Sequence, residues 1–252
     1  VLSVYHTNGG TGYPSHQGEI ILFGKEHGEV LAIVDAMSVT KIRTGAVSAV
    51  ASQALARKNA KTLAILGCGA QGHSHLDAMA EAFGLTQVYT WDAYPQAAEG
   101  LAKAAQDKEI AGKACETVKE AVANADIVCT VTPSKVPILK KEWLRPGTHV
   151  NAVGACAPAD RELDSELAAG SRFFGDNRES VFHESGDFLI PMKEGCYTEE
   201  HYAGTLGDVL LGKQTGRTSD EEITVFEALG MAVEDIACAI YLYEQAKGGS
   251  DR

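Results

Sequence analysis

Three glycines with the spacing G-x-G-x-x-G, Gly67, Gly69 and Gly72, follow a short apolar run over residues 63–66. At this spacing the first glycine permits a tight turn, the second lets the backbone approach a pyrophosphate, and the third lets the next helix lie close to the strand. A helical pattern begins directly after the glycines, so the free N–H groups at its start would face the phosphates. The motif alone is equally compatible with an ordinary turn between a strand and a helix.

The strand that follows this motif is closed by an acid. Residues 87–91 have the pattern of a second strand, and Asp92 comes directly after it, about 20 residues beyond Gly72. A carboxylate at that position would accept hydrogen bonds from the ribose hydroxyls of an adenine dinucleotide. The order strand, glycines, helix, strand and acid therefore predicts a dinucleotide site.

Further candidate residues stand where other predicted strands end, because the ligands of doubly wound sheets lie at the carboxyl ends of the strands. Thr132 follows an apolar strand and would lie beside the nicotinamide and its ribose, whereas a plain strand-ending turn is the alternative. The segment 152–158 follows another strand in the same way. The candidates at these two strand ends are Thr130, Val131, Thr132, Ala152, Val153, Gly154 and Cys156.

Arg43 is a cation within an otherwise small and apolar helix face that contains Val39, Ala46 and Val47. A guanidinium in such surroundings requires an anionic partner, and its planar fork suits a carboxylate. The residues leave two alternatives open. Arg43 binds a substrate carboxylate, or it forms a structural ion pair with an Asp or Glu of the chain.

Composition and charge exclude several classes of protein. A formal net charge of −12 without a basic run argues against nucleic-acid and anionic-membrane partners. No apolar run approaches the length of a membrane span, and no signal peptide is visible. The six cysteines include no C-x-x-C pair, and His73 and His75 face different sides of a helix, so we expect no metal site. Cysteines in apolar runs are typical of a reducing compartment, and we expect a cytoplasmic protein.

The alternation of elements predicts an α/β fold, a doubly wound Rossmann parallel sheet with a second, discontinuous α+β domain for dimerisation and substrate binding. Strands are expected at 63–66, 87–91, 126–131, 149–153, 172–174 and 223–226, and helices at 75–83, 95–108, 116–123, 162–167 and 206–211, with an irregular segment through residue 191. The second domain is expected to comprise residues 1–42 plus 231–252, and the dinucleotide-binding domain residues 43–230. Because the chain begins inside a strand pattern, we expect an N-terminal part to precede Val1.

Several motifs, in order along nearly the whole chain, resemble those of the ornithine cyclodeaminase/mu-crystallin family, and most closely its mu-crystallin branch. They are RTGAVSA (43–49), G-x-GAQG-x-SH (67–75), NAVGA (151–155), RELD (161–164) and TVF-x-x-LGMAVED (224–235). The resemblance implies a homodimer that uses NADH or NADPH and acts on a small cyclic imine carboxylate.

The resemblance also assigns roles to individual residues. Arg43 falls on the arginine that holds the substrate carboxylate, and the family's active-site lysine is expected just before Val1. The residues expected to contact the cofactor, from the motifs and the resemblance together, are Ser15, His16, Thr44, Gly67, Gly69, Ala70, Gln71, Gly72, Asp92, Thr130, Val131, Thr132, Ala152, Val153 and Gly154.

The chain departs from the family pattern at two informative positions. Cyclodeaminases carry an acid in the substrate pocket where this chain has Cys156, and a thiol poorly replaces that general base, so ornithine cyclisation is disfavoured. Mu-crystallins carry residues that suit a 2′-phosphate after the second strand, whereas Asp92 would repel that phosphate. We therefore expect a preference for NADH.

These observations together predict an oxidoreductase acting on C=N bonds, which reduces a cyclic ketimine carboxylate to a cyclic L-amino acid. One alternative is a crystallin-type protein that binds thyroid hormone and NADP without turnover. Ornithine cyclodeaminase and alanine dehydrogenase activity are the others.

Overall fold

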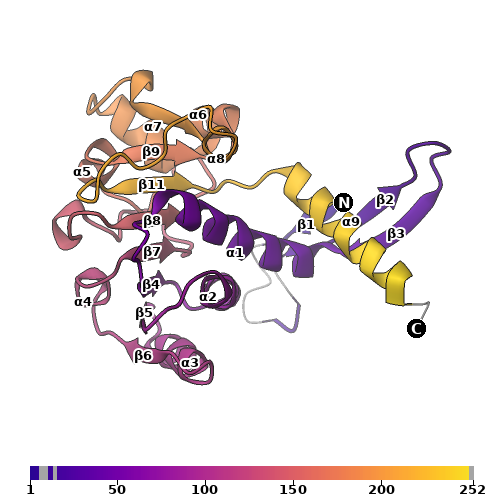
Figure 1. The fold of residues 1–252 in the computed structure, drawn as a ribbon, viewed down its shortest axis with the longest axis horizontal. Helices are drawn as coiled ribbons and strands as arrows, with labels where there is room; N and C mark the ends of the chain where they lie inside the picture. Colours follow the sequence, from indigo (N-terminus) through magenta and orange to yellow (C-terminus); the bar gives the residue numbers. More distant parts are fainter. Residues whose placement is uncertain (6–10, 14–15, 250–252) are drawn as a thin grey trace. The chain divides into compact units, whose positions relative to one another are not determined.

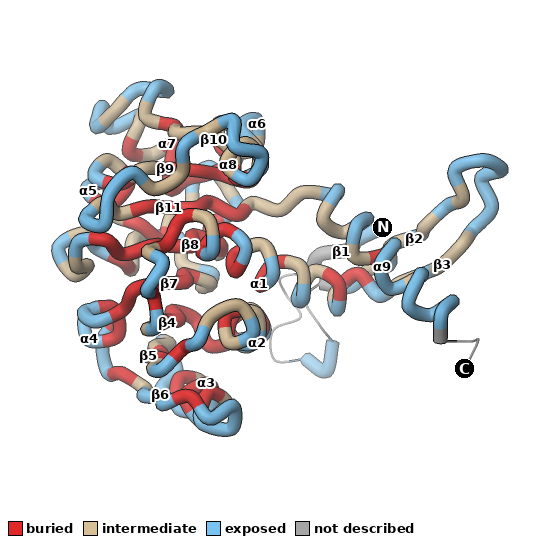
Figure 2. Tube along the Cα trace, viewed as in Figure 1, coloured by how far each residue is buried: buried red, intermediate tan, exposed pale blue. Residues whose placement is uncertain are grey.

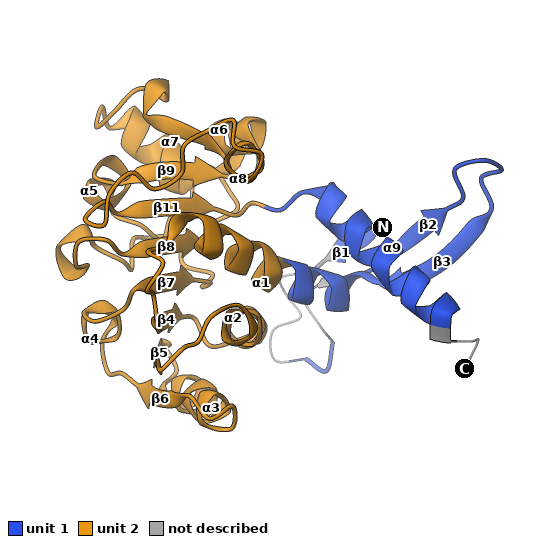
Figure 3. Ribbon diagram, viewed as in Figure 1, with its two compact units in different colours: residues 1–43, 230–252 blue, residues 44–229 orange. Residues whose placement is uncertain are grey.

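The structure, a computed structural model, describes residues 1–5, 11–13 and 16–249, and it divides into two compact units (Figure 3). Unit 1 contains residues 1–43 and 230–252, and unit 2 contains residues 44–229. The chain therefore leaves unit 1, forms the whole of unit 2, and returns to unit 1 for its last helix.

Unit 2 is built on a parallel sheet of eight strands in the order β10-β9-β11-β8-β7-β4-β5-β6 (Figure 1). The strands are β4 (Thr62–Leu66), β5 (Gln87–Trp91), β6 (Ala111–Ala114), β7 (Ile127–Thr130), β8 (His149–Ala152), β9 (Arg172–Gly175), β10 (Tyr202–Thr205) and β11 (Thr224–Glu227). The chain steps from β4 outward to β6 and then crosses to β7, on the other side of β4. This reversal creates a topological switch point between β4 and β7, where doubly wound sheets bind dinucleotides.

Helices cover both faces of this sheet, and alternate residues of β4 supply the two cores. Leu63 and Ile65 pack with the first three helices, whereas Ala64 and Leu66 pack with the next four. Strands β4, β7 and β8 are buried along almost their whole length (Figure 2). The helices are α1 (Ala36–Leu55), α2 (Ala70–Ala82), α3 (Pro95–Gln106), α4 (Val118–Val122), α5 (Ser165–Ala169), α6 (Arg178–Glu184), α7 (Gly186–Lys193) and α8 (Leu206–Leu210).

Unit 1 combines a three-stranded antiparallel sheet with the C-terminal helix. Strands β1 (Leu2–Val4), β2 (His16–Phe23) and β3 (Val30–Asp35) lie in that order, and α9 (Ala232–Gly249) packs against β2 and β3. Most of α9 is exposed, in contrast to the central strands of unit 2 (Figure 2). Judged by length and hydropathy together, none of the helices in the described part of the chain could span a bilayer.

The predicted fold class is confirmed, but several parts of the element prediction are wrong. The segment expected to be irregular contains α6 and α7, which begin at the N-caps Asn177 and Ser185; their side chains accept hydrogen bonds from backbone N–H groups three residues ahead. The helix expected from residue 162 begins at Ser165, because Asp164 caps it. Strands β6 and β10 gave no signal, since AGKA and YAGT are short and rich in small residues.

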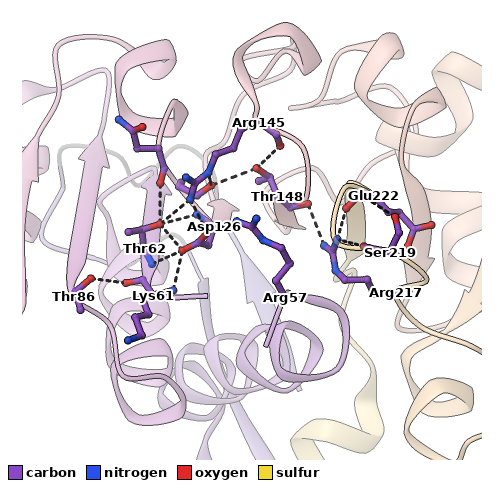
Figure 4. Close-up of polar contacts among 12 residues, drawn as sticks. Arg57, Lys61, Thr62, Thr86, Asp126, Arg145, Thr148, Arg217, Ser219 and Glu222 are labelled. Carbon is purple, nitrogen blue, oxygen red and sulfur yellow. Dashed lines mark hydrogen bonds and ion pairs between the residues drawn. The ribbon is translucent and has the colours of Figure 1, made fainter. Parts of the chain in front are cut away.

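At the amino end of the sheet, where β4 and β7 begin, one carboxylate is surrounded by donors (Figure 4). Oδ1 of Asp126 accepts hydrogen bonds from Nη2 of Arg57 (2.5 Å) and of Arg145 (2.6 Å). Oδ2 accepts them from the backbone N–H groups of Lys61 (2.9 Å) and Thr62 (3.0 Å). Burial alone would raise the pKa of Asp126, but these hydrogen bonds and the charge of Arg145 hold it below its usual value.

Candidate cofactor and substrate site

The glycine turn connects β4 to α2 and leaves open space beside it. Gly67 has a left-handed backbone conformation (φ +99°), and a Cβ atom there would lie 2.8 Å from the carbonyl oxygen of Val131. A Cβ atom on Gly72 would lie 2.3 Å from the carbonyl oxygen of Gly67, so any other residue would push the helix away from the strand. Gly69 differs, because no described atom lies within 4 Å of its Cβ position. The space beside Gly69 is therefore open to a ligand.

The start of α2 provides hydrogen-bond donors next to this space. The helix begins at Ala70 with Gly69 as its N-cap, and no described side chain caps its first N–H groups. Uncapped N–H groups and the positive end of a helix dipole attract phosphate. The predicted start near His75 is wrong, because Ala70 and Gln71 already belong to the first turn. The chain thus fits the pyrophosphate of a dinucleotide.

Asp92 lies at the same end of the sheet, directly after β5. Its Oδ2 accepts a hydrogen bond from the backbone N–H of Cys68 (2.6 Å), and its Oδ1 accepts one from the N–H of Tyr94 (2.9 Å). The first of these bonds fixes the carboxylate beside the glycine turn. Each carboxylate oxygen has capacity for a second hydrogen bond, so Asp92 retains acceptors for ribose hydroxyls. Burial, followed by the charge of Asp92, raises the pKa of the Cys68 thiol to about 12, so that thiol stays neutral.

A buried glutamate joins the turns after β7 and β8. Thr130 and Ala152, the last residues of these strands, pair with each other. Thr132 lies two residues after the end of β7. Its N–H (2.8 Å) and its hydroxyl (2.5 Å) both donate to Oε1 of Glu162. Oε2 accepts one from the N–H of Gly154 (2.9 Å). Sequence reasoning missed Glu162 as a site residue, although the RELD motif that contains it was a signal that could have found it.

Two further buried acids lie close to Glu162 in this part of unit 2. Oδ1 of Asp187 accepts hydrogen bonds from the backbone N–H groups of Glu162 (2.9 Å) and Leu163 (2.7 Å). Glu227, the last residue of β11, accepts one from the Ser185 hydroxyl (2.8 Å). Burial raises the pKa of all three carboxyls. The negative charge of Glu162 raises that of Asp187 further, and the charge of Asp187 does the same for Glu227. We call Glu162, Asp187 and Glu227 the carboxyl-end acids.

The structure gathers most of the predicted cofactor residues at this end of the sheet: the glycine turn, Asp92, and the strand ends 130–132 and 152–154. Cys156 is exposed on the loop after β8, and its thiol donates to the carbonyl oxygen of Val153 (3.4 Å). Thr44 is buried on α1. Ser15 lies outside the described residues, and His16 begins β2 in unit 1.

Arg43, the predicted substrate residue, is paired with two acids of unit 1. Its Nη1 lies 3.0 Å from Oε2 of Glu234, and its Nε lies 3.2 Å from Oδ1 of Asp235, both on α9. Of the two alternatives that the sequence left open, the structural ion pair is thus present. A guanidinium has N–H groups on three nitrogens, and these pairs engage two of them.

A parallel sheet with this strand order, whose first strand leads through a glycine turn into an uncapped helix, defines the class of Rossmann-type dinucleotide-binding proteins. Sequence comparison narrows this class. The chain belongs to the ornithine cyclodeaminase/mu-crystallin family, which it matches over residues 1–250. The resemblance read from the motifs is thereby confirmed.

Three similar proteins indicate the chemistry of these relatives. Ketimine reductase mu-crystallin of Mus musculus is 38% identical over 249 residues, which cover 99% of this chain and 76% of the mouse protein. The structure of Thermococcus litoralis Delta(1)-pyrroline-2-carboxylate reductase with NADH and L-proline matches with a TM-score of 0.95 and 37% identity, covering 99% of this chain and 78% of that one. An archaeal alanine dehydrogenase dimer with bound NAD matches with a TM-score of 0.94 and 34% identity, covering 99% and 77%.

Proposed function

We propose that this protein uses NADH or NADPH to reduce a cyclic ketimine carboxylate to a cyclic L-amino acid. The observation that carries the proposal is the open space at Gly69 with Asp92 fixed beside it, in a chain similar over nearly its whole length to two imine reductases. The glycine turn supports a dinucleotide, and the relatives support the reaction class. Neither argument suffices alone.

In this proposal the dinucleotide lies across the switch point between β4 and β7. Asp92 binds the ribose of the adenosine half, and the pyrophosphate lies at Gly69 and the first turn of α2. The nicotinamide half lies at the turns after β7 and β8. On the resemblance, Ser15, His16 and Thr44 complete the set of contacts.

We propose that Arg43 anchors the substrate carboxylate while its ion pairs hold the guanidinium in place. The pairs to Glu234 and Asp235 engage two of its three nitrogens and fix the plane of the group. A planar guanidinium that is already fixed loses less conformational freedom when it binds a carboxylate. In this proposal the guanidinium forms its ion pairs through Nε and Nη1 and binds the substrate carboxylate through its remaining N–H groups.

The reduced nicotinamide, when bound, supplies a hydride to the carbon of the C=N bond. The residues of the chain orient the reactants: Arg43 fixes the carboxylate and therefore the carbon next to it, and the strand-end turns hold the nicotinamide ring. Fixing both reactants in this way removes much of the entropic barrier. The imine nitrogen gains a proton, which the resemblance assigns to the family lysine. Cys156, in place of the cyclodeaminase acid, supports plain reduction without loss of the amino group.

We propose that NADH is preferred over NADPH. Asp92 places a negative charge where the adenosine ribose is expected, and this charge would repel a 2′-phosphate. Backbone N–H groups hold both of its oxygens, so the carboxylate is not free to turn away. The expected result is a KM for NADH about tenfold or more below that for NADPH.

Turnover tests the proposal directly. NADH oxidation by the full-length protein is followed by absorbance with piperideine-2-carboxylate and with pyrroline-2-carboxylate as substrates. We expect turnover of at least one of them and none with L-ornithine and NAD. Turnover of neither, or oxidation of L-alanine with NAD as the fastest reaction, would overturn the ketimine assignment.

We also propose that two copies of the chain associate through unit 1. Large apolar side chains are exposed on its strands and on α9, including Phe23, Ile33, Val233, Ile236 and Tyr241. Exposed apolar surface of this extent is typical of an interface. The similar alanine dehydrogenase is described as a dimer. Sedimentation of the purified protein as a monomer would contradict the proposal.

Finally, we propose that the protein works in the cytoplasm. All six cysteines are free thiols, and three of them are buried. Free thiols persist in a reducing compartment. Fractionation of cells that express the protein tests this point.

A further inference from the structure

Glu162 sets the separation of two turns at the carboxyl end of the sheet. Its two carboxylate oxygens bond to different turns, one to Thr132 after β7 and the other to Gly154 after β8. The turns are also in direct contact, because a Cβ atom on Gly154 would lie 2.1 Å from the carbonyl oxygen of Thr132. A side chain of another length or charge could not satisfy both turns at their present positions.

Glu162 is itself fixed, because its backbone is held on both sides. Its N–H donates to Oδ1 of Asp187 (2.9 Å), and its carbonyl oxygen accepts from the N–H groups of Ile138 (2.8 Å) and Leu139 (2.9 Å). The side chain has no exposed surface, so water cannot replace a lost partner at low cost. The hydroxyl of Thr132 is fixed as well, since it donates to Glu162 and accepts from the N–H of Ser134 (3.2 Å).

We propose that Glu162 is a positioning residue for the nicotinamide half of the cofactor, which it supports by clamping the turns after β7 and β8 to each other. The inference rests on the proposed function, which places the nicotinamide at these turns. Within the described part of the chain, the hydrogen bonds of the Glu162 side chain go to Thr132 and Gly154, not to the glycine turn or Asp92. Loss of Glu162 should therefore weaken binding of the nicotinamide half and spare the adenosine half.

Two ligands separate these halves. NADH contains both, whereas ADP has the adenosine and the pyrophosphate without the second ribose and the nicotinamide. Calorimetric titration of the full-length protein compares the wild type with Glu162→Gln, which keeps the volume but removes the charge. We expect Glu162→Gln to weaken NADH about tenfold or more and ADP by less than about twofold. The matched control, Glu166→Gln, changes an exposed glutamate four residues away and should alter neither affinity.

A second pair of variants covers the case in which Glu162→Gln does not fold. Thr132→Val removes one donor to the carboxylate, and Thr132→Ser keeps it. We expect Thr132→Val to weaken NADH about threefold without affecting ADP, and Thr132→Ser to keep the wild-type affinity. Equal weakening of both ligands, or no effect on NADH, would overturn the role of Glu162. Failure of the wild-type protein to bind NADH is a separate outcome, which overturns the proposed function and the inference with it.

Discussion

Asp126, at the amino end of the eight-stranded sheet, accepts hydrogen bonds from two arginines, whereas the carboxyl-end acids Glu162, Asp187 and Glu227 accept theirs from neutral groups. Among the described residues, none of the carboxyl-end acids forms an ion pair with Lys or Arg. The pKa shifts at the two ends of the sheet therefore have opposite signs. The pKa of Asp126 is lowered, and the pKa values of Glu162, Asp187 and Glu227 are raised.

This difference indicates that the amino end of the sheet stabilises the fold, whereas the carboxyl end serves function. A buried carboxylate that is matched by cations and N–H groups favours the folded state, whereas buried acids with raised pKa values oppose it near neutral pH. Buried acids with raised pKa values concentrate at functional sites, where their placement matters more than their cost to stability. The carboxyl end of a doubly wound sheet is also where its ligands bind. We therefore assign the amino end to holding the fold together and the carboxyl end to holding the cofactor.

The largest expected effect is on stability, at the amino end. Asp126→Ala leaves the half-buried guanidinium of Arg57 and two backbone N–H groups without their partner, and should lower the free energy of unfolding by about 3 kcal/mol. Urea denaturation measures this loss. The control is Asp77→Ala, which removes an exposed ion pair with Lys108 and should cost less than about 1 kcal/mol. Equal losses for the two variants would remove the distinction between the amino end and ordinary surface.

The second prediction concerns a larger side chain at the carboxyl end, which should affect cofactor binding and not stability. Gly69→Val fills the open space beside the glycine turn without meeting any described atom at Cβ, so the free energy of unfolding should change by less than about 1 kcal/mol while NADH affinity falls about tenfold or more. The matched control is Gly84→Val, since Gly84 also has open space at its Cβ position and lies in the loop after α2. That variant should bind NADH like the wild type. Unchanged NADH affinity in Gly69→Val would argue against a pyrophosphate at this turn.

The smallest expected effect concerns pH. Because the pKa of Asp187 is raised by folding, the folded protein binds more protons than the unfolded chain above its ordinary value of 3.8, and stability should fall as the pH rises from about 5 to about 8. Asp187→Asn removes this group and should make the fall with pH shallower, although Glu227 still contributes. Denaturation at several pH values measures it, with the exposed Asp107→Asn as control. Asp126 acts in the opposite direction, since its contribution is lost only as the pH falls below its ordinary value of 3.8.

Local patterns predicted the parts of the fold that depend on neighbouring residues. Strand β4 lies where its apolar run lies, because burial on both faces selects such a run. Strand β5 lies where it was predicted as well, and its residues alternate between buried and half-buried positions. The helices α6 and α7 escaped prediction, since Pro191 inside α7 reads as a helix breaker and the caps at Asn177 and Ser185 are visible only as common polar residues.

The residues of the candidate site likewise fall into those that local patterns predict and those that only the folded chain brings together. Gly67, Gly69 and Asp92 follow from spacing along the chain, because one turn and two adjacent strands position them. Glu162 does not, since it lies 30 residues from Thr132 in the sequence, and only the folded sheet brings the two together. The partner of Arg43 was equally out of reach, because Glu234 lies 191 residues further along the chain.

Transfer of deuterium tests the central claim most directly. The full-length protein is supplied with NADH deuterated on the reactive face of the nicotinamide C4 position and with piperideine-2-carboxylate, and the product is analysed by mass spectrometry and NMR. We predict a cyclic L-amino acid that carries one deuterium on the carbon next to its carboxylate. A product without deuterium at that carbon, or no product although NADH is bound, would contradict hydride transfer at the carboxyl end of this sheet.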